Sequence, residues 1–294
     1  MMFRSCALTA MLMATPVQAQ DCTAIGDQAR IAATALDEAA LTATYAAADR
    51  CDPALKTWIG QRLAAAMYNR AMKGSPVDEA ALEQSLRYGR PWQTLATLGD
   101  IAAGRRDFAK AAARYQDALI EIADEVATPR RPGDAILVAL RSKAEEAALL
   151  SPTYVKSARM RSGQQVGLSA DSLRGVTFRP AALPVQFVFD STELTTKGQD
   201  ALVDLVSLLA NDSAKGREII LVGHTDAKGD ADYNLRLSQS RAMVVKEYLL
   251  RNGYRGTIRA EGRGEEQPYE PDDKSAYSEA ERDQMSRRVE LIRR

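Results

Sequence analysis

Two side chains of opposite charge, Asp226 and Arg241, are the strongest candidates for chemistry in this 294-residue sequence. Asp226 follows the apolar run EIILVGH, and we expect it at the end of a central strand. Arg241 lies four residues after Leu237 and three before Val244, so it shares the apolar face of a predicted helix. Leaving a partly buried carboxylate or guanidinium unpaired costs several kcal/mol, so each needs a partner of opposite charge.

An acid and a base at one edge of a domain suit a zwitterionic ligand, since the guanidinium can hold a carboxylate and the carboxylate an ammonium. Two simpler arrangements stay open: a structural ion pair between Asp226 and Arg241, and an Arg241 that extends along apolar surface to reach water. His224 is the only histidine, which excludes histidine-rich zinc sites, and no second carboxylate has a clear catalytic role. We therefore expect no enzyme activity, no metal and no cofactor.

The elements around this pair predict an α/β domain. The run PVQFVFD, residues 184–190, alternates like a strand, and a helix with leucines at helical spacing follows it. The nearly all-apolar run 218–224 predicts a central strand covered on both faces. After the Arg241 helix, TIRAEG and RRVELI supply two more strands. The order βαβαββ predicts one mixed sheet with helices on one face.

The chain before this domain predicts helices only, because residues 23–150 are rich in alanine and leucine at helical spacing. Breaks are expected at 74–76, 89–91, 104–105 and 129–133. Residues 91–124 resemble a tetratricopeptide repeat, with small residues where two helices approach closely. Residues 55–88 form a looser copy, and 134–149 a capping helix. An irregular alanine-rich bundle is the alternative.

The predicted protein is therefore multidomain: a signal peptide at 1–19, an all-α TPR-like domain at 20–150, a linker at 151–182 and an α/β domain at 183–294. The linker is predicted because prolines and glycines replace the helical period there. The first residues combine Arg4, a short apolar run and the small-residue pattern Val17-Gln18-Ala19, which is typical of a cleavable secretory signal. A buried N-terminal helix is the alternative.

The number and positions of the cysteines agree with a protein secreted from the cytoplasm. Cys6 lies in the removed segment, which leaves Cys22 and Cys51 as a pair that an oxidising compartment would join in a disulfide. Two free thiols are the alternative. Neither Cys6 nor Cys22 follows a lipoprotein-type sequence, so we expect no lipid anchor. With 39 basic and 39 acidic side chains, the chain has no net field to attract nucleic acid or an anionic membrane, and no later segment predicts a membrane span.

Several separated blocks carry a family resemblance: FVFDSTEL, VGHTDAKGDADYNLRLSQSRAMVVKEYLLRNGY, GRGEEQP and SRRVELI. In this order they resemble the OmpA-like domain, over roughly residues 184–294. The resemblance implies noncovalent binding of peptidoglycan through its diaminopimelate residue, with Asp226 and Arg241 at the ligand positions. Two features depart from the family: Ser286 stands where an asparagine is usual, and the segment 269–285 is long and acidic.

Further ligand contacts are expected around the same strand ends. Asn234 begins the Arg241 helix, where it could cap the backbone or meet the ligand. Backbone donors or packing could come from Thr225, Phe189 and Asp190. By strand alternation, either Arg287 or Arg288 could face the site, or both could form a solvated charge pair.

The expected protein is located in the periplasm and associated with the wall, with the periphery of the outer membrane as an open option. It would bind diaminopimelate-type peptidoglycan through its C-terminal domain and a protein partner through its helical domain. One alternative is an interaction scaffold for which wall binding is minor. The other is a cell-wall hydrolase.

Overall fold

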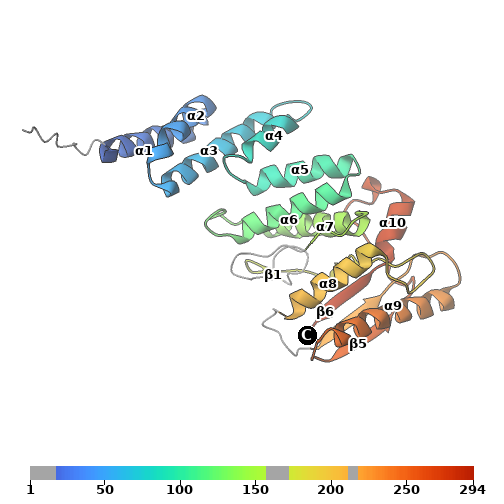
Figure 1. The fold of residues 1–294 in the computed structure, drawn as a ribbon. Coiled ribbons are helices and arrows are strands. Elements are labelled where there is room, and N and C mark those ends of the chain that lie inside the picture. Colours follow the sequence, from blue (N-terminus) through green and yellow to red (C-terminus); the bar gives the residue numbers. More distant parts are fainter. Residues whose placement is uncertain (1–17, 157–171, 211–217) are drawn as a thin grey trace, which may run out of the picture. The chain divides into compact units, whose positions relative to one another are not determined.

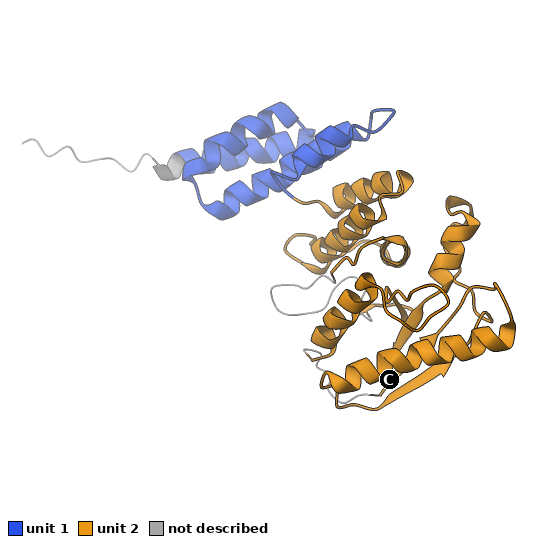
Figure 2. Cartoon of the chain, turned by 45° about the vertical axis from the view of Figure 1, so that its right-hand side comes forward, with its two compact units in different colours: residues 1–89 blue, residues 90–294 orange. Residues whose placement is uncertain are grey.

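The chain folds into two compact units, residues 1–89 and 90–294 (Figure 2). The computed structural model describes residues 18–156, 172–210 and 218–294 (Figure 1). This division differs from the predicted one, since the helices between residues 92 and 150 belong to the same unit as the sheet. Most of the predicted signal peptide and the middle of the predicted linker lie outside the described residues.

The first unit is helical, with helices α1 (Gln18–Ala35), α2 (Glu38–Ala47), α3 (Pro53–Ala71) and α4 (Glu79–Ser85) and a 3-10 turn at Ala48–Arg50. Aspartates start three of these helices, because a side-chain oxygen accepts an otherwise unpaired backbone N–H there. These N-caps are Asp37, Asp52 and Asp78. A core of buried side chains from α1, α2 and α3 holds the unit together.

A disulfide joins Cys22 of α1 to Cys51, which follows the 3-10 turn. The predicted pairing is therefore confirmed, and the alternative of two free thiols is wrong. The bond closes a loop with a sequence separation of 29 residues. It ties the first helix to the start of α3.

The second unit begins with the predicted helical hairpin, α5 (Trp92–Gly104) and α6 (Phe108–Ala123), followed by α7 (Asp134–Leu150). A Cβ on Gly99 would lie 2.5 Å from the Tyr115 ring, so α5 and α6 approach closely where the sequence places a small residue. Three of the four predicted helix breaks fall between observed helices, and the fourth, 104–105, spans the end of α5 at Gly104. Whether these helices function as tetratricopeptide repeats stays a prediction.

The sheet has four strands in the order β3-β6-β4-β5, with bounds β3 (Ala181–Leu183), β4 (Ile219–Gly223), β5 (Ile258–Gly262) and β6 (Val289–Arg293). Strand β4 runs parallel to β5 and antiparallel to β6, which confirms the mixed sheet. The predicted strand at 184–190 is wrong in position. The edge strand is β3, and the residues after it contribute an isolated bridge between Phe187 and Leu194.

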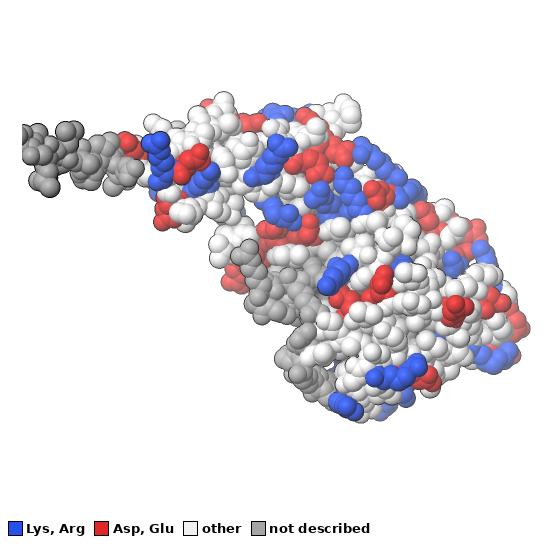
Figure 3. Space-filling model, viewed as in Figure 1, with Lys and Arg blue, Asp and Glu red and all other residues white. Residues whose placement is uncertain are grey.

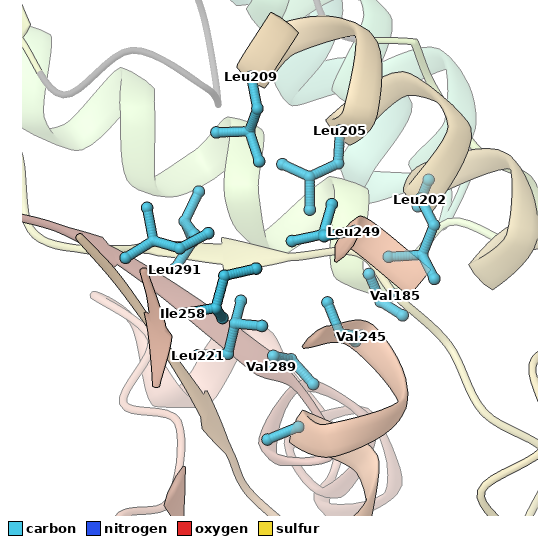
Figure 4. Packing of buried hydrophobic residues seen from close by; sticks show 13 residues of the cluster. Val185, Leu202, Leu205, Leu209, Leu221, Val245, Leu249, Ile258, Val289 and Leu291 are labelled. Atoms are coloured by element: carbon cyan, nitrogen blue, oxygen red, sulfur yellow. The ribbon is translucent and has the colours of Figure 1, made fainter. Parts of the chain in front are cut away.

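Helices α8 (Thr196–Ala210) and α9 (Ala231–Arg251) each bury one face of leucines and valines against the sheet (Figure 4). The shared core includes Leu205 of α8, Leu249 of α9 and Leu221 of β4. All five residues of β4 are buried, as a central strand requires. The remaining elements of the unit are a small ladder of β1 (Ser172–Leu173) and β2 (Val176–Thr177), a 3-10 turn at Lys274–Ala276, and α10 (Glu279–Ser286).

Charges of both signs are interspersed on the visible face, without a wide area of one sign (Figure 3). The pattern on this face fits the balanced composition of 39 basic and 39 acidic side chains. Among the described helices, none combines the length and apolar character that crossing a bilayer requires.

Replacing both Cys22 and Cys51 with alanine should lower the free energy of unfolding of the first unit by about 3 kcal/mol, because the open loop restores conformational entropy to the unfolded chain. Urea unfolding, monitored by amide hydrogen–deuterium exchange of peptides from α1–α3, measures this change. The second unit serves as the internal control and should be unaffected. Equal stability of parent and variant in the first unit would contradict the expectation.

Candidate functional site

Asp226 lies where the chain leaves β4. The N–H of His224 donates to the carbonyl of Arg288 and that of Thr225 to the carbonyl of Gly264, so two strands hold this exit. The Asp226 side chain is buried, and its Oδ1 accepts the N–H of Lys228 at 3.1 Å. Its Oδ2 pairs with the guanidinium of Arg287.

Two glycines let α9 approach these strand ends. A Cβ on Gly223 would lie 2.1 Å from the carbonyl oxygen of Ser238, and one on Gly262 would lie 2.6 Å from the Ser238 hydroxyl. Any larger residue would push the helix away. Asp230 caps α9 by accepting the N–H of Tyr233 at 2.9 Å. Arg241, one turn after Ser238, is thereby held over the edge of the sheet.

Arg241 is only 4% exposed, so it does not extend into water. Its Nε donates to the carbonyl of Ser191 at 3.0 Å, and its Nη2 makes a long contact of 3.5 Å to the carbonyl of Val188. The guanidinium carbon lies 5.1 Å from the centroid of the Phe187 ring. Across the described ranges, no carboxylate is within ion-pair distance of Arg241, so the structural Asp226–Arg241 pair is not observed.

The electrostatic surroundings of Arg241 favour an added anion. Burial lowers the pKa of Arg241, and the nearby charge of Arg287 lowers it further, although Asp226 partly opposes both effects. The charged guanidinium is therefore under-compensated where it lies. An anion entering beside it would be stabilised by the same field.

A pocket of about 190 Å³ opens beside Arg241. Its lining combines three cationic side chains with apolar ones and, over the part of the chain described, contains no carboxylate. The lining residues are Leu149, Pro184, Val185, Gln186, Phe187, Phe189, Lys197, Arg241, Gln284 and Arg287. This is a suitable environment for an anionic group that carries an apolar stem.

Asn234 is buried directly beneath the Asp226 turn. Its Nδ2 donates to the carbonyl of Lys228 at 3.1 Å and to Oε2 of Glu265 at 2.7 Å, with a longer contact of 3.4 Å to the carbonyl of Asp226. These bonds hold the turn, so Asn234 positions Asp226 in this structure. Thr225 is buried beside it, and its Oγ1 has no hydrogen-bond partner among the described atoms.

Residues 186–282 match the OmpA family. The outer membrane protein A of Shimwellia blattae is 41% identical over 85 residues, which are 29% of this chain and 35% of that protein. The chain spans about a third or less of the length of the curated relatives it matches. The C-terminal domain is an OmpA-like domain.

Two solved structures align with this OmpA-like domain. The peptidoglycan-associated lipoprotein of Burkholderia pseudomallei is 32% identical, with 37% of this chain and 88% of that chain covered and a TM-score of 0.32. The cell wall anchor of the T6SS from Pseudomonas aeruginosa is 26% identical, with 38% and 76% covered and a TM-score of 0.31.

Phe189 and Asp190 lie in a turn of the OmpA-like domain and not in a strand. Phe189 is 80% exposed at the edge of the pocket. Asp190 has a φ of 52°, in the left-handed region, and its Oδ1 accepts the Tyr233 hydroxyl at 2.7 Å. Both therefore lie near Arg241, as the sequence predicted, but in a turn where the sequence predicted a strand.

The paired arginines diverge, as strand alternation allows. Arg287 lines the pocket and pairs with Asp226. Arg288 is buried elsewhere, with its Nε donating to Glu290 at 2.8 Å and its guanidinium 5.4 Å from the Tyr269 ring centroid. Ser286, the departure from the family, accepts the N–H of Tyr269 at 3.1 Å.

Sequence reasoning did not predict several of the pocket residues as site residues, among them Phe187, Lys197 and Gln284. Alternation along 184–190 marked Phe187 as apolar and buried, but nothing in the pattern indicated that a guanidinium lies over its ring. No sequence pattern marked Lys197 or Gln284 as a site residue, because both donate to backbone carbonyls of α7, which residue types do not reveal.

Glu290 beside the site gives a pH-dependent prediction. Burial opposes its ionisation, but His224 and Arg288 outweigh burial and lower the pKa of Glu290 from 4.5 to about 2. A depressed carboxyl pKa stabilises the fold above the unfolded value, and this stabilisation is lost as pH falls from about 5 toward 2. Glu290→Gln should therefore flatten the acid limb of the stability curve, with a loss of up to about 3 kcal/mol at neutral pH.

Urea unfolding at a series of pH values tests this expectation. Glu261→Gln, at a more exposed carboxyl paired with Arg263, is the matched control and should follow the parent. An acid limb in Glu290→Gln as steep as that of the parent would contradict the assignment.

Proposed function

We propose that this protein binds peptidoglycan noncovalently through its OmpA-like domain, with the diaminopimelate of the stem peptide as the recognised group. The observation that carries the proposal is Arg241: a buried guanidinium at the edge of a pocket, with no carboxylate partner in the described residues and with Asp226 nearby. The OmpA family match at 186–282 supports it.

The free amino-acid end of diaminopimelate carries a carboxylate and an ammonium. The carboxylate would replace the long contact to the Val188 carbonyl and pair with the Arg241 guanidinium, gaining charge-assisted hydrogen bonds. The ammonium would approach Asp226, whose present partner Arg287 is 32% exposed in its side chain. Arg287 could then turn toward the ligand carboxylate.

The remaining pocket groups suit the aliphatic part of the same ligand. Phe187 lies under the guanidinium and Phe189 is exposed at the edge, so an alkyl stem would lie against aromatic surface. Asn234 contributes by holding the turn that carries Asp226. The chemistry required is recognition and not bond cleavage.

We further propose that wall binding tethers the helical region to the cell wall in the periplasm, where that region engages a protein partner. The disulfide in the first unit fits an oxidising compartment. The paired α5–α6 helices fit a TPR-like interaction module, since such helices present extended surfaces.

Asp226→Ala and Arg241→Ala should each lower the free energy of binding to diaminopimelate-type sacculi by about 2 kcal/mol or more, because each leaves a ligand charge unpaired. Cosedimentation with purified sacculi measures the change. Asp232→Ala and Arg251→Ala, at exposed positions on α9, are the charge-matched controls and should bind like the parent. Parent-like binding by both site variants would refute the mechanism, as would equal binding to lysine-type walls.

Cell fractionation tests the proposed location. The protein should appear in the periplasm and with sedimented sacculi, and its mass should lack residues 1–19. The Arg241→Ala variant should remain periplasmic but leave the sacculus fraction, because only the wall contact is removed. Recovery in the cytoplasm alone would contradict the location.

A further inference from the structure

The long acidic segment 269–285, a departure from the family pattern, binds helix α7. The Tyr269 hydroxyl donates to Oε1 of Glu145 at 3.1 Å, and the Tyr277 hydroxyl donates to Oε2 of Glu146 at 2.8 Å. The N–H of Asp272 also reaches Oε1 of Glu146 at 3.3 Å. Both glutamates are buried. Glu145 also pairs with Arg141 of α7 itself at 2.8 Å and with Arg179 at 3.2 Å, so the OmpA-like domain supplies the Glu146 donors and part of those of Glu145.

The C-terminal end of α7 is held by two side chains of the same domain. Lys197 is 4% exposed, and its Nζ donates to the carbonyls of Ala148 at 2.9 Å, Leu149 at 3.0 Å and Ser151 at 2.7 Å. Gln284 donates to the Leu149 carbonyl at 3.1 Å. A helix end leaves carbonyls unpaired and carries partial negative charge, so a buried ammonium is a suitable cap.

These same groups reach the pocket beside Arg241. Leu149, Lys197 and Gln284 all line it, together with Arg241 and Arg287. Helix α7 ends at residue 150, well before the family match begins at residue 186. One lining residue, Leu149, therefore comes from a helix that lies outside the matched domain.

We propose that the C-terminal turn of α7, held by Lys197 and Gln284, is part of the peptidoglycan site, so that docking of α7 and binding of the wall ligand stabilise one another. This inference rests on the proposed function, and it assigns Lys197 and Gln284 as positioning residues. A ligand that fits the pocket only when α7 is docked must favour the docked state, and by reciprocity the docked state must favour the ligand.

The coupling connects the wall site to the helical hairpin. Helix α7 packs against α6, and Arg106 of the α5–α6 turn donates to the Ala276 carbonyl at 2.9 Å. Ligand binding would thus hold the hairpin in one arrangement on the OmpA-like domain. A partner bound to the hairpin would in turn alter affinity for the wall.

Hydrogen–deuterium exchange on the full mature chain, with a soluble diaminopimelate-containing muropeptide, tests the coupling. The muropeptide should slow exchange of peptides covering residues 144–151. Lys197→Met and Tyr277→Phe should speed that exchange without ligand and weaken muropeptide affinity by about 5-fold or more. Tyr277 does not line the pocket, so its effect would arise through docking alone. Lys246→Met removes a lysine from α9 and should match the parent.

The outcomes separate the two proposals. A parent chain that does not bind the muropeptide would overturn the proposed function, and this inference with it. A parent that binds, but with unchanged exchange at 144–151 and with parent-like affinity in Tyr277→Phe, would overturn the coupling alone. If Lys197→Met fails to fold, the parent exchange and Tyr277→Phe still decide the matter.

Discussion

The arrangement of the OmpA-like domain depends on the need to satisfy a buried guanidinium. Arg241 lies in the apolar stripe of α9, and its donors reach the carbonyls of Ser191 and Val188. Those carbonyls can face the helix only if the chain turns there, which it does, with Asp190 in the left-handed region. Ordered pairing of β3 ends at Leu183, and residues that follow it, among them Phe187 and Phe189, line the pocket.

Backbone carbonyls solvate a guanidinium without neutralising it, and this distinction gives the site its proposed chemistry. A carboxylate partner inside the protein would have removed the attraction for an outside anion. Here the nearby carboxylate of Asp226 is taken by Arg287, which is the more exposed of the two arginines. The site thus contains the buried guanidinium of Arg241, which has no carboxylate partner in the described chain. It also contains the carboxylate of Asp226, whose partner Arg287 can move.

Periodicity and residue type predicted much of this arrangement. The burial of β4, the course of α9, the cysteine pair and the α5–α6 hairpin followed from local pattern. Contacts between residues that lie far apart in the sequence were harder to predict from local pattern. Alternation left Arg287 and Arg288 equivalent until the sheet register was known. The α7 contacts of Lys197 and Tyr277 could not be predicted, since they join side chains to groups 46 and 131 residues away.

The predicted linker shows the same limit. Prolines and glycines after residue 150 correctly marked the end of the helices, but composition does not reveal whether the elements on either side pack together. Buried glutamates on α7 decide that question here, because Tyr269 and Tyr277 of the OmpA-like domain donate to them.

A crystal structure of the mature chain with a bound diaminopimelate muropeptide tests the central claim most directly. The account predicts a ligand carboxylate within hydrogen-bond distance of the Arg241 guanidinium and a ligand ammonium beside Asp226. A muropeptide bound elsewhere, with Arg241 still donating only to the carbonyls of Val188 and Ser191, would contradict it.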